Sequence, residues 1–271
     1  MLVPFHDDNP TTRAPIVTLA IVAVNATVLY GVYRLPPDKQ AMLFYARGFV
    51  PARIAQLFDG KPLEIEVREP APRLGAPDLV RIRRIALPPS PRQILLSLLT
   101  CMFLHGGWMH FIGNMWFLWL FGNNVEDRLG HVPFLFFYLV GGLLASACHW
   151  VTGPGSTAPV IGASGAVAAV LGAYAITWPW ARVRSLLFLF IFVTIVDLPA
   201  LLVLGFWFLM QLASATATAD LQLGGGVAWW AHVGGFLAGL VVMPLLDPLR
   251  AEHDEEIVVL EPREDDDEGY F

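Results

Sequence analysis

A serine, two histidines and an asparagine stand near the beginnings of three apolar segments of this 271-residue chain. His110 and Asn114 lie four residues apart in "HGGWMHFIGNMWFLWLFGN", so a helix places them on one face. Ser164 lies in "IGASGAVAAVLGAYAI", and His232 lies in "WWAHVGGFLAGLVV". Serine needs a base to take its proton, and imidazole, with a pKa of about 6.5, is suited to that role. These residue types are therefore sufficient for nucleophilic catalysis if the fold brings them together.

A nucleophilic serine also needs hydrogen-bond donors where the charge of a tetrahedral oxyanion develops. The predicted donors are the side chains of His110 and Asn114 and the backbone N–H of Ser164 at a helix N-terminus. No acidic residue lies at the same depth in a helix to make a third triad member. The predicted arrangement is a dyad of Ser164 and His232.

Each of these residues also has a structural interpretation. Ser164 between small residues suits helix packing, His232 could make a structural hydrogen bond, and His110 with Asn114 could clamp two helices. His105, which lacks the i+4 spacing to His110, is interpreted as a boundary residue. A metal site of His105, His110 and His232 is disfavoured, because no carboxylate or thiolate completes a recognisable ligand set. We therefore predict no metal.

The composition indicates what kind of fold must position these residues. Hydrophobic residues make up 56% of the chain and charged residues 15%, which is typical of a polytopic membrane protein. Because a span needs roughly 20 mostly apolar residues, we predict an all-α bundle of six transmembrane helices. They fall at about residues 16–33, 107–125, 132–152, 161–178, 199–215 and 227–246. The apolar stretch 185–196 is predicted to be an interfacial or partly buried approach to the fifth helix.

The basic residues of the short loops predict the orientation. They follow the second, fourth and sixth spans, whereas loops 153–160 and 216–226 contain none. Short loops rich in Lys and Arg stay inside, so both termini are expected in the cytoplasm. The second, fourth and sixth helices then run from the outer face inward. Their first turns, which carry the four polar residues, are expected at one depth.

The chain divides into three predicted parts. Residues 1–14 form a cytoplasmic N-terminus, residues 15–247 the membrane domain with an extracytoplasmic loop at 34–106, and residues 248–271 a cytoplasmic tail. Within the loop, "LEIEVREP" and "LVRIRRIAL" alternate like short strands, and residues 94–104 suit an interfacial helix. After Arg250 the chain has ten acidic residues and one arginine, which predicts a disordered tail.

Small residues predict that the fourth and sixth helices approach closely. Small-xxx-small faces let helix backbones come together, and packing these two faces would bring Ser164 within hydrogen-bond reach of His232. Gly162 is expected to let the chain bend into the site. The residues of the two faces are Gly165, Ala169 and Gly172 on the fourth helix and Gly235 and Gly239 on the sixth.

Taken in order, these motifs resemble those of the rhomboid intramembrane serine proteases over residues 15–247. The matching residues are His105 with "HFIGN" at 110–114, "EDR" at 126–128, "GASG" around Ser164, and "AHVGGFLAG" with His232, Gly235 and Gly239. The resemblance implies a six-helix core, Ser164 as nucleophile and His232 as general base. It assigns the oxyanion hole to His110, Asn114 and the Ser164 amide.

The resemblance also implies roles for segments around the site. Glu126 and Arg128 match an element that forms a structural network at the cytoplasmic end of the second helix. The first loop looks like a membrane-embedded loop, and the fifth helix with its following loop looks like a mobile substrate gate. Two features depart from the pattern. Ala168 stands where many relatives carry an aromatic residue against the histidine, and the arginine-rich segment 61–87 enlarges the first loop.

From the residues and the resemblance together we expect an intramembrane serine endopeptidase. It would cleave transmembrane segments of membrane proteins near the extracytoplasmic face through an acyl-enzyme. Its expected partners are such substrates and the lipid bilayer, with no nucleic acid and no cofactor, and its expected location is a bacterial inner membrane. The alternative is a non-catalytic rhomboid-like factor that binds membrane proteins for quality control. A transporter is disfavoured because the sequence shows no repeat and the polar cluster lies toward one face.

Overall fold

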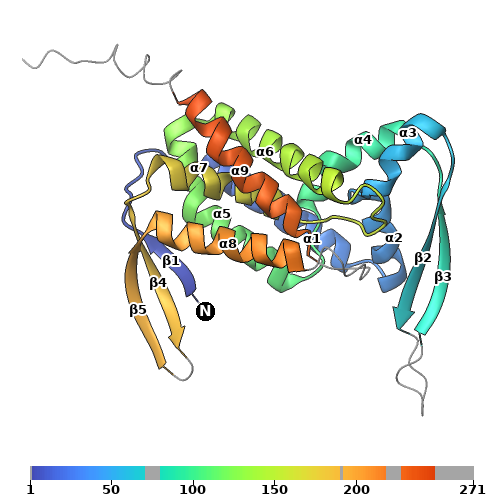
Figure 1. The fold of residues 1–271 in the computed structure, drawn as a ribbon, viewed down its shortest axis with the longest axis horizontal. Helices are drawn as coiled ribbons and strands as arrows, with labels where there is room; N and C mark the ends of the chain where they lie inside the picture. The colour runs from blue at the N-terminus through green and yellow to red at the C-terminus, as the bar shows by residue number, and fades with distance from the viewer. Residues whose placement is uncertain (1, 71–79, 190–191, 218–226, 248–271) are drawn as a thin grey trace, which may run out of the picture.

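The computed structural model describes residues 2–70, 80–189, 192–217 and 227–247. Each of the six predicted spans is a helix there, which confirms the predicted all-α membrane bundle. The corresponding helices are α1 (Ile16–Tyr33), α5 (Trp108–Leu129), α6 (His131–Thr152), α7 (Ser164–Thr177), α8 (Ala200–Ala217) and α9 (Trp229–Leu246). These helices run along the long axis of the molecule (Figure 1).

Among the described residues, four of these helices are long and apolar enough to cross a membrane by themselves, namely α1, α6, α8 and α9. A fifth span results if α5 is joined to the preceding segment Pro91–Phe103, from which it is bent by 79°. Helix α7 has 14 residues and is therefore about 21 Å long, shorter than the roughly 30 Å hydrocarbon core. One end of α7 must therefore lie within the thickness of the bundle.

Helix α7 is the centre of the bundle. Every residue from Ala166 to Ala175 is buried, which explains why the segment is apolar on all sides. Its contact with α9 is backbone to backbone, because a Cβ at Gly235 would collide with the carbonyl oxygen of Gly165, and one at Gly239 with that of Ala169. A Cβ at Gly172 would likewise collide with the carbonyl of Phe236. The two small-residue faces thus set the distance between the helices.

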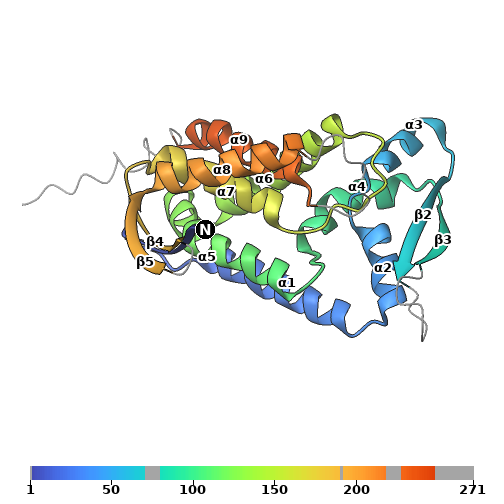
Figure 2. The ribbon, with the colours of Figure 1, turned by 60° about the horizontal axis from the view of Figure 1, so that its bottom comes forward.

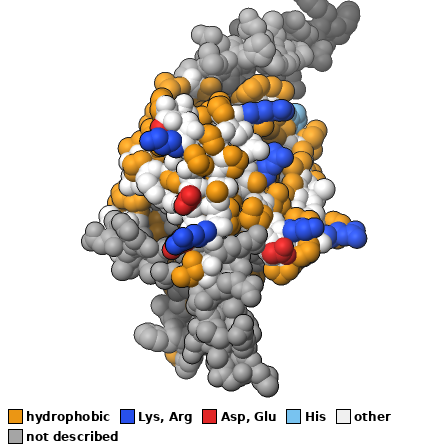
Figure 3. All heavy atoms as spheres, turned by 90° about the vertical axis from the view of Figure 1, so that its right-hand side faces the viewer, with side chains coloured by type: hydrophobic (Ala, Val, Ile, Leu, Met, Phe, Trp, Pro, Cys, Tyr) orange, Lys and Arg blue, Asp and Glu red, His pale blue; other side chains and the backbone are white. Residues whose placement is uncertain are grey.

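The first loop folds at one end of the bundle, at the right of Figure 1. It contains α2 (Pro37–Arg47), the 3-10 turn Pro51–Ala55, α3 (Gln56–Asp59), β2 (Leu63–Pro70), β3 (Val80–Leu87), α4 (Pro91–Thr100) and the 3-10 turn Cys101–Phe103. Strands β2 and β3 pair antiparallel from Leu63–Leu87 to Pro70–Val80, so the prediction of strands is confirmed. Figure 3 shows Lys and Arg side chains scattered among hydrophobic ones on this end of the molecule.

Residues 185–189 and 192–196, predicted as part of an interfacial or partly buried approach to the fifth helix, lie in a hairpin of β4 (Arg182–Leu189) and β5 (Phe192–Pro199). The N-terminal strand β1 (Leu2–Asp7) pairs with β4. A continuous apolar run does not distinguish a strand from a buried or interfacial helix by its periodicity. The pairing of β1 with a strand about 180 residues later has no local signal.

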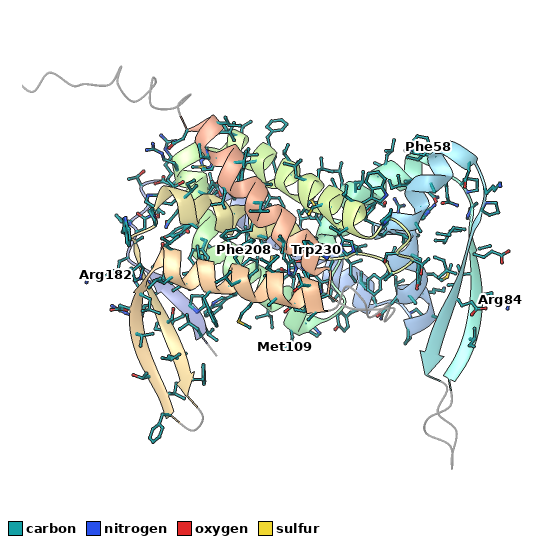
Figure 4. All side chains as sticks on the ribbon, viewed as in Figure 1. Phe58, Arg84, Met109, Arg182, Phe208 and Trp230 are labelled. Carbon is teal, nitrogen blue, oxygen red and sulfur yellow. The ribbon has the colours of Figure 1, made fainter. Side chains whose placement is uncertain are left out.

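The two hairpins lie at opposite ends of the helices (Figures 1 and 2). Arg84 of β3 and Arg182 of β4 lie at these two ends (Figure 4). Because α7 runs from Ser164 at its start to the β4–β5 hairpin after its end, Ser164 faces the end that carries the first loop.

Candidate active site

Ser164 and His232 meet between the first turns of α7 and α9. The distance from Ser164 Oγ to His232 Nε2 is 2.8 Å, which is a hydrogen bond. His232 is 8% exposed, so its imidazole is largely removed from water. Ser164 is the first residue of α7, and no side chain caps that helix. Its backbone N–H is therefore one of those that have no acceptor within the helix.

Gly162 brings the first turn of α5 to the same place. Its φ is +122°, a backbone conformation that residues other than glycine rarely adopt. A Cβ at this position would lie 2.6 Å from His110 Nε2 and 3.6 Å from Ser164 Oγ. The absence of a side chain at Gly162 thus leaves room for the imidazole of His110 beside the serine. The Gly162 N–H also donates to the carbonyl of Cys101 at 2.9 Å, which fixes the loop before α7.

Asn114 lies one turn after His110 in α5, and it is 8% exposed. Its amide nitrogen Nδ2 is buried and has no hydrogen-bond partner within the described ranges. A buried polar group without a partner is uncommon and calls for an explanation. An unused donor on the helix face of His110 is what an oxyanion hole requires.

His105 is fully buried within the protein, and its ring meets the His110 ring edge to face with 5.1 Å between centroids. Phe111 packs edge-on against the same His105 ring at 5.5 Å. His105 therefore supports the orientation of His110 by packing. The spacing of five residues concealed this contact, because His105 lies in the break that precedes α5.

Gln211 of α8 is a site residue that the sequence analysis missed. Its side-chain Oε1 lies 2.8 Å from His232 Nδ1, and the residue is 9% exposed. The signal in the sequence was an amide side chain inside an apolar segment, where polar groups are costly and commonly functional. It was overlooked because α8 runs opposite to α5, α7 and α9, so the site faces its second half rather than its first turn.

Two tryptophans flank His232, although the position one turn after Ser164 is Ala168 and not an aromatic residue. The Trp207 ring lies 6.1 Å from the His232 ring at 34°, and the Trp229 ring lies 5.9 Å away at 89°. Ala168 is fully buried and lies against Gly235, so its small size serves the contact of α7 with α9. The imidazole is bounded by α8 and by its own helix instead.

The "EDR" residues lie at the other end of α5, away from the serine. Glu126, 1% exposed, accepts the backbone N–H groups of Val17 and Thr18 in the first turn of α1, at 2.8 and 2.7 Å. His131 Nδ1 lies 2.6 Å from the same carboxylate. Arg128 pairs with Asp247 after α9 at 2.6 Å. These residues join α1, α5 and α9.

The chain matches the model of the Rhomboid domain over residues 92–248, more than half of its length. It is 32% identical over 101 residues to presenilin-associated rhomboid-like protein A, mitochondrial, of Danio rerio, a match that covers 36% of this chain and 26% of that protein. It is 34% identical over 94 residues to rhomboid-like protein 11, chloroplastic, of Arabidopsis thaliana, covering 32% of each. The human presenilin-associated rhomboid-like protein, mitochondrial, is 30% identical over 104 residues, covering 38% and 27% respectively.

The fold and the site define an integral membrane protein whose helices enclose a hydrogen-bonded serine and histidine. The match over more than half of its length shows that the chain belongs to the rhomboid family. The chain spans about a quarter to a third of the length of these relatives.

Proposed function

We propose that this protein is an intramembrane serine endopeptidase that cleaves transmembrane segments of other membrane proteins. The observation that carries the proposal is the 2.8 Å hydrogen bond between Ser164 Oγ and His232 Nε2 in a buried setting. In a non-catalytic binding protein this contact would be a structural hydrogen bond and nothing more. The proposal is favoured because an imidazole nitrogen that accepts the serine proton is what a nucleophilic serine requires.

The proposed reaction follows from the geometry. His232 Nε2 takes the proton of Ser164 Oγ as the hydroxyl attacks the peptide carbon, and then gives it to the leaving amine. The acyl-enzyme is released by water that His232 activates in turn. The His110 imidazole, the free Nδ2 of Asn114 and the Ser164 backbone N–H are the proposed donors to the oxyanion. Helical peptide bonds are shielded, so the substrate must unwind at the cleavage point.

The proposed orientation places both termini in the cytoplasm and the site toward the extracytoplasmic face. The short loops after the second and fourth helices and the segment after the sixth contain Arg, whereas the short loops 153–160 and 216–226 contain no basic residue. The long first loop is rich in Arg, but long loops cross the membrane largely regardless of their charge. The relatives named above are mitochondrial and chloroplastic. Their names give no support to the expectation of a bacterial inner membrane, so the proposal concerns orientation alone.

Serine-directed labelling tests the proposed function. Purified protein in detergent is treated with a fluorophosphonate and, separately, mixed with a transmembrane reporter substrate. We expect Ser164→Ala and His232→Ala to lose both labelling and cleavage. The matched control is Ser97→Ala, which removes a buried hydroxyl whose one hydrogen bond among the described residues is to the Ile94 carbonyl of its own helix. Equal labelling and cleavage by all four proteins would overturn the assignment.

A further inference from the structure

Residue Gln211 on α8 lies behind His232, on the side away from Ser164. The imidazole makes two hydrogen bonds, Nε2 to Ser164 Oγ and Nδ1 to Gln211 Oε1, each of 2.8 Å. Both partners of the second bond are less than a tenth exposed, so water does not readily replace it. Three helices, α7, α8 and α9, thus each contribute one residue to a single chain of hydrogen bonds.

The chemistry of an amide oxygen determines what this bond does. Gln Oε1 accepts hydrogen bonds and has no proton to donate, so with the Gln211 amide in this orientation the hydrogen bond requires a proton on His232 Nδ1. A neutral imidazole has one N–H, which leaves Nε2 with its lone pair toward Ser164. This is the tautomer that a general base needs, whereas the opposite tautomer points N–H at the serine and cannot accept its proton.

We propose that Gln211 is a positioning residue that fixes the tautomer and the ring orientation of His232. The inference deepens the proposed function, on which it rests, by adding to the dyad a neutral third member from α8. It also explains how the His232 ring is held in place although Ala168, and not an aromatic residue, stands one turn after Ser164. The Gln211 amide and the ring of Trp207, one turn earlier on α8, hold the imidazole from the side opposite α7.

The orientation of the general base, His232, therefore depends on the packing of α8. This helix is held to α9 by the stacked rings of Phe208 and Phe236, with 4.8 Å between centroids and 25° between planes. Figure 4 shows Phe208 between the two helices. Ser164 and His232 are carried by α7 and α9, whose glycine contacts fix their spacing without α8. The dyad therefore forms between α7 and α9, and Gln211 of α8 fixes the tautomer of His232.

The test compares Gln211→Met, which keeps the length of the side chain and removes the acceptor, with Gln211→Glu, which keeps an acceptor oxygen. With the reporter substrate, we expect Gln211→Met to lower kcat about tenfold, the value of one neutral hydrogen bond, at an unchanged KM. Gln211→Glu is expected to restore most of kcat. Thr216→Val on the same helix is the control, because within the described part of the chain the Thr216 hydroxyl bonds only to carbonyls of α8.

A second measurement does not depend on activity. In protein labelled with ¹⁵N-histidine, the His232 signals, assigned by their loss in His232→Ala, report which ring nitrogen carries the proton. We expect Nδ1–H in the wild type and in Gln211→Glu, and loss of this preference in Gln211→Met.

A wild-type His232 with the proton on Nε2, or a Gln211→Met protein with an unchanged tautomer, would overturn the inference. Failure of the wild type to label or cleave refutes the protease assignment instead, and the ¹⁵N signals still decide whether Gln211 sets the tautomer.

Discussion

The two ends of helix α5 use buried polar side chains in opposite ways. At its start, Asn114 Nδ2 is buried without a partner in the described part of the chain. At its end, Glu126 is also buried but accepts two backbone N–H groups of α1 and lies against His131. A buried charge that is fully bonded holds helices together, whereas a donor without a partner has free bonding capacity. The comparison separates a proposed donor to a reacting group, Asn114, from residues that build the bundle.

The largest effect that tests this contrast is expected from Asn114→Leu, a change of similar volume that removes the donor. If Nδ2 stabilises the oxyanion, kcat falls about 100- to 1,000-fold, the usual cost of losing one such donor. The thermal unfolding midpoint should not fall, since no hydrogen bond within the described residues is lost. Cleavage of the reporter and unfolding in detergent measure the two quantities.

Asn124→Leu is the matched control, ten residues along the same helix. Asn124 Nδ2 donates to the carboxylate of Asp7 at 2.6 Å, so this variant should lose stability and keep its activity per folded molecule. If Asn114→Leu lost as much stability as Asn124→Leu, the two asparagines would have the same structural role and the contrast between the ends of α5 would be wrong.

A smaller effect is expected from Glu126→Gln at the structural end. The change leaves one acceptor oxygen for the N–H groups of Val17 and Thr18 and removes the charge that strengthens both bonds. Hydrogen bonds to a charged group contribute about 1.5–3 kcal/mol each, so we expect a loss of about 2 kcal/mol in unfolding free energy. Reporter cleavage by the folded fraction should stay unchanged.

The control is Glu66→Gln, because Glu66 pairs with Arg84 on the exposed face of the β2–β3 hairpin. Exposed pairs contribute about 0–1 kcal/mol. Equal losses of unfolding free energy in Glu66→Gln and Glu126→Gln would show that the burial of Glu126 adds nothing to its contribution to stability.

The smallest effect concerns the exposed β4–β5 hairpin. The hydrogen bond from the Arg184 guanidinium, at 2.9 Å, lowers the pKa of the Asp197 carboxyl below its ordinary value of 3.8. A carboxyl with a lowered pKa stabilises the folded state above 3.8, and this contribution is lost as the pH falls below that value. The protection factors of the β4 and β5 amides against hydrogen exchange should therefore fall on acidification more in the wild type than in Asp197→Asn. An identical pH response in both proteins would contradict the assignment.

Much of the bundle was predictable because the signals are local. A run of about 20 apolar residues specifies a helix wherever it packs, and loop charges predict direction. For these reasons the segments of α1 and α5 to α9 were predicted, and the first turns of α5, α7 and α9 were expected at one level. The strands of the β4–β5 hairpin were not predicted, because an apolar stretch of that length is compatible with either a strand or a helix.

The sequence by itself determined the helices, the close contact of α7 with α9 through their small residues, and the four polar residues of the predicted site. The tertiary structure alone decided that Gln211 meets His232 and that β1 joins β4. Helix formation depends on neighbours a few residues away, so composition and spacing reveal it. The contacts of Gln211 and β1 join residues 21 to about 180 positions apart, and such pairs are fixed by how the finished elements pack together rather than by any local pattern.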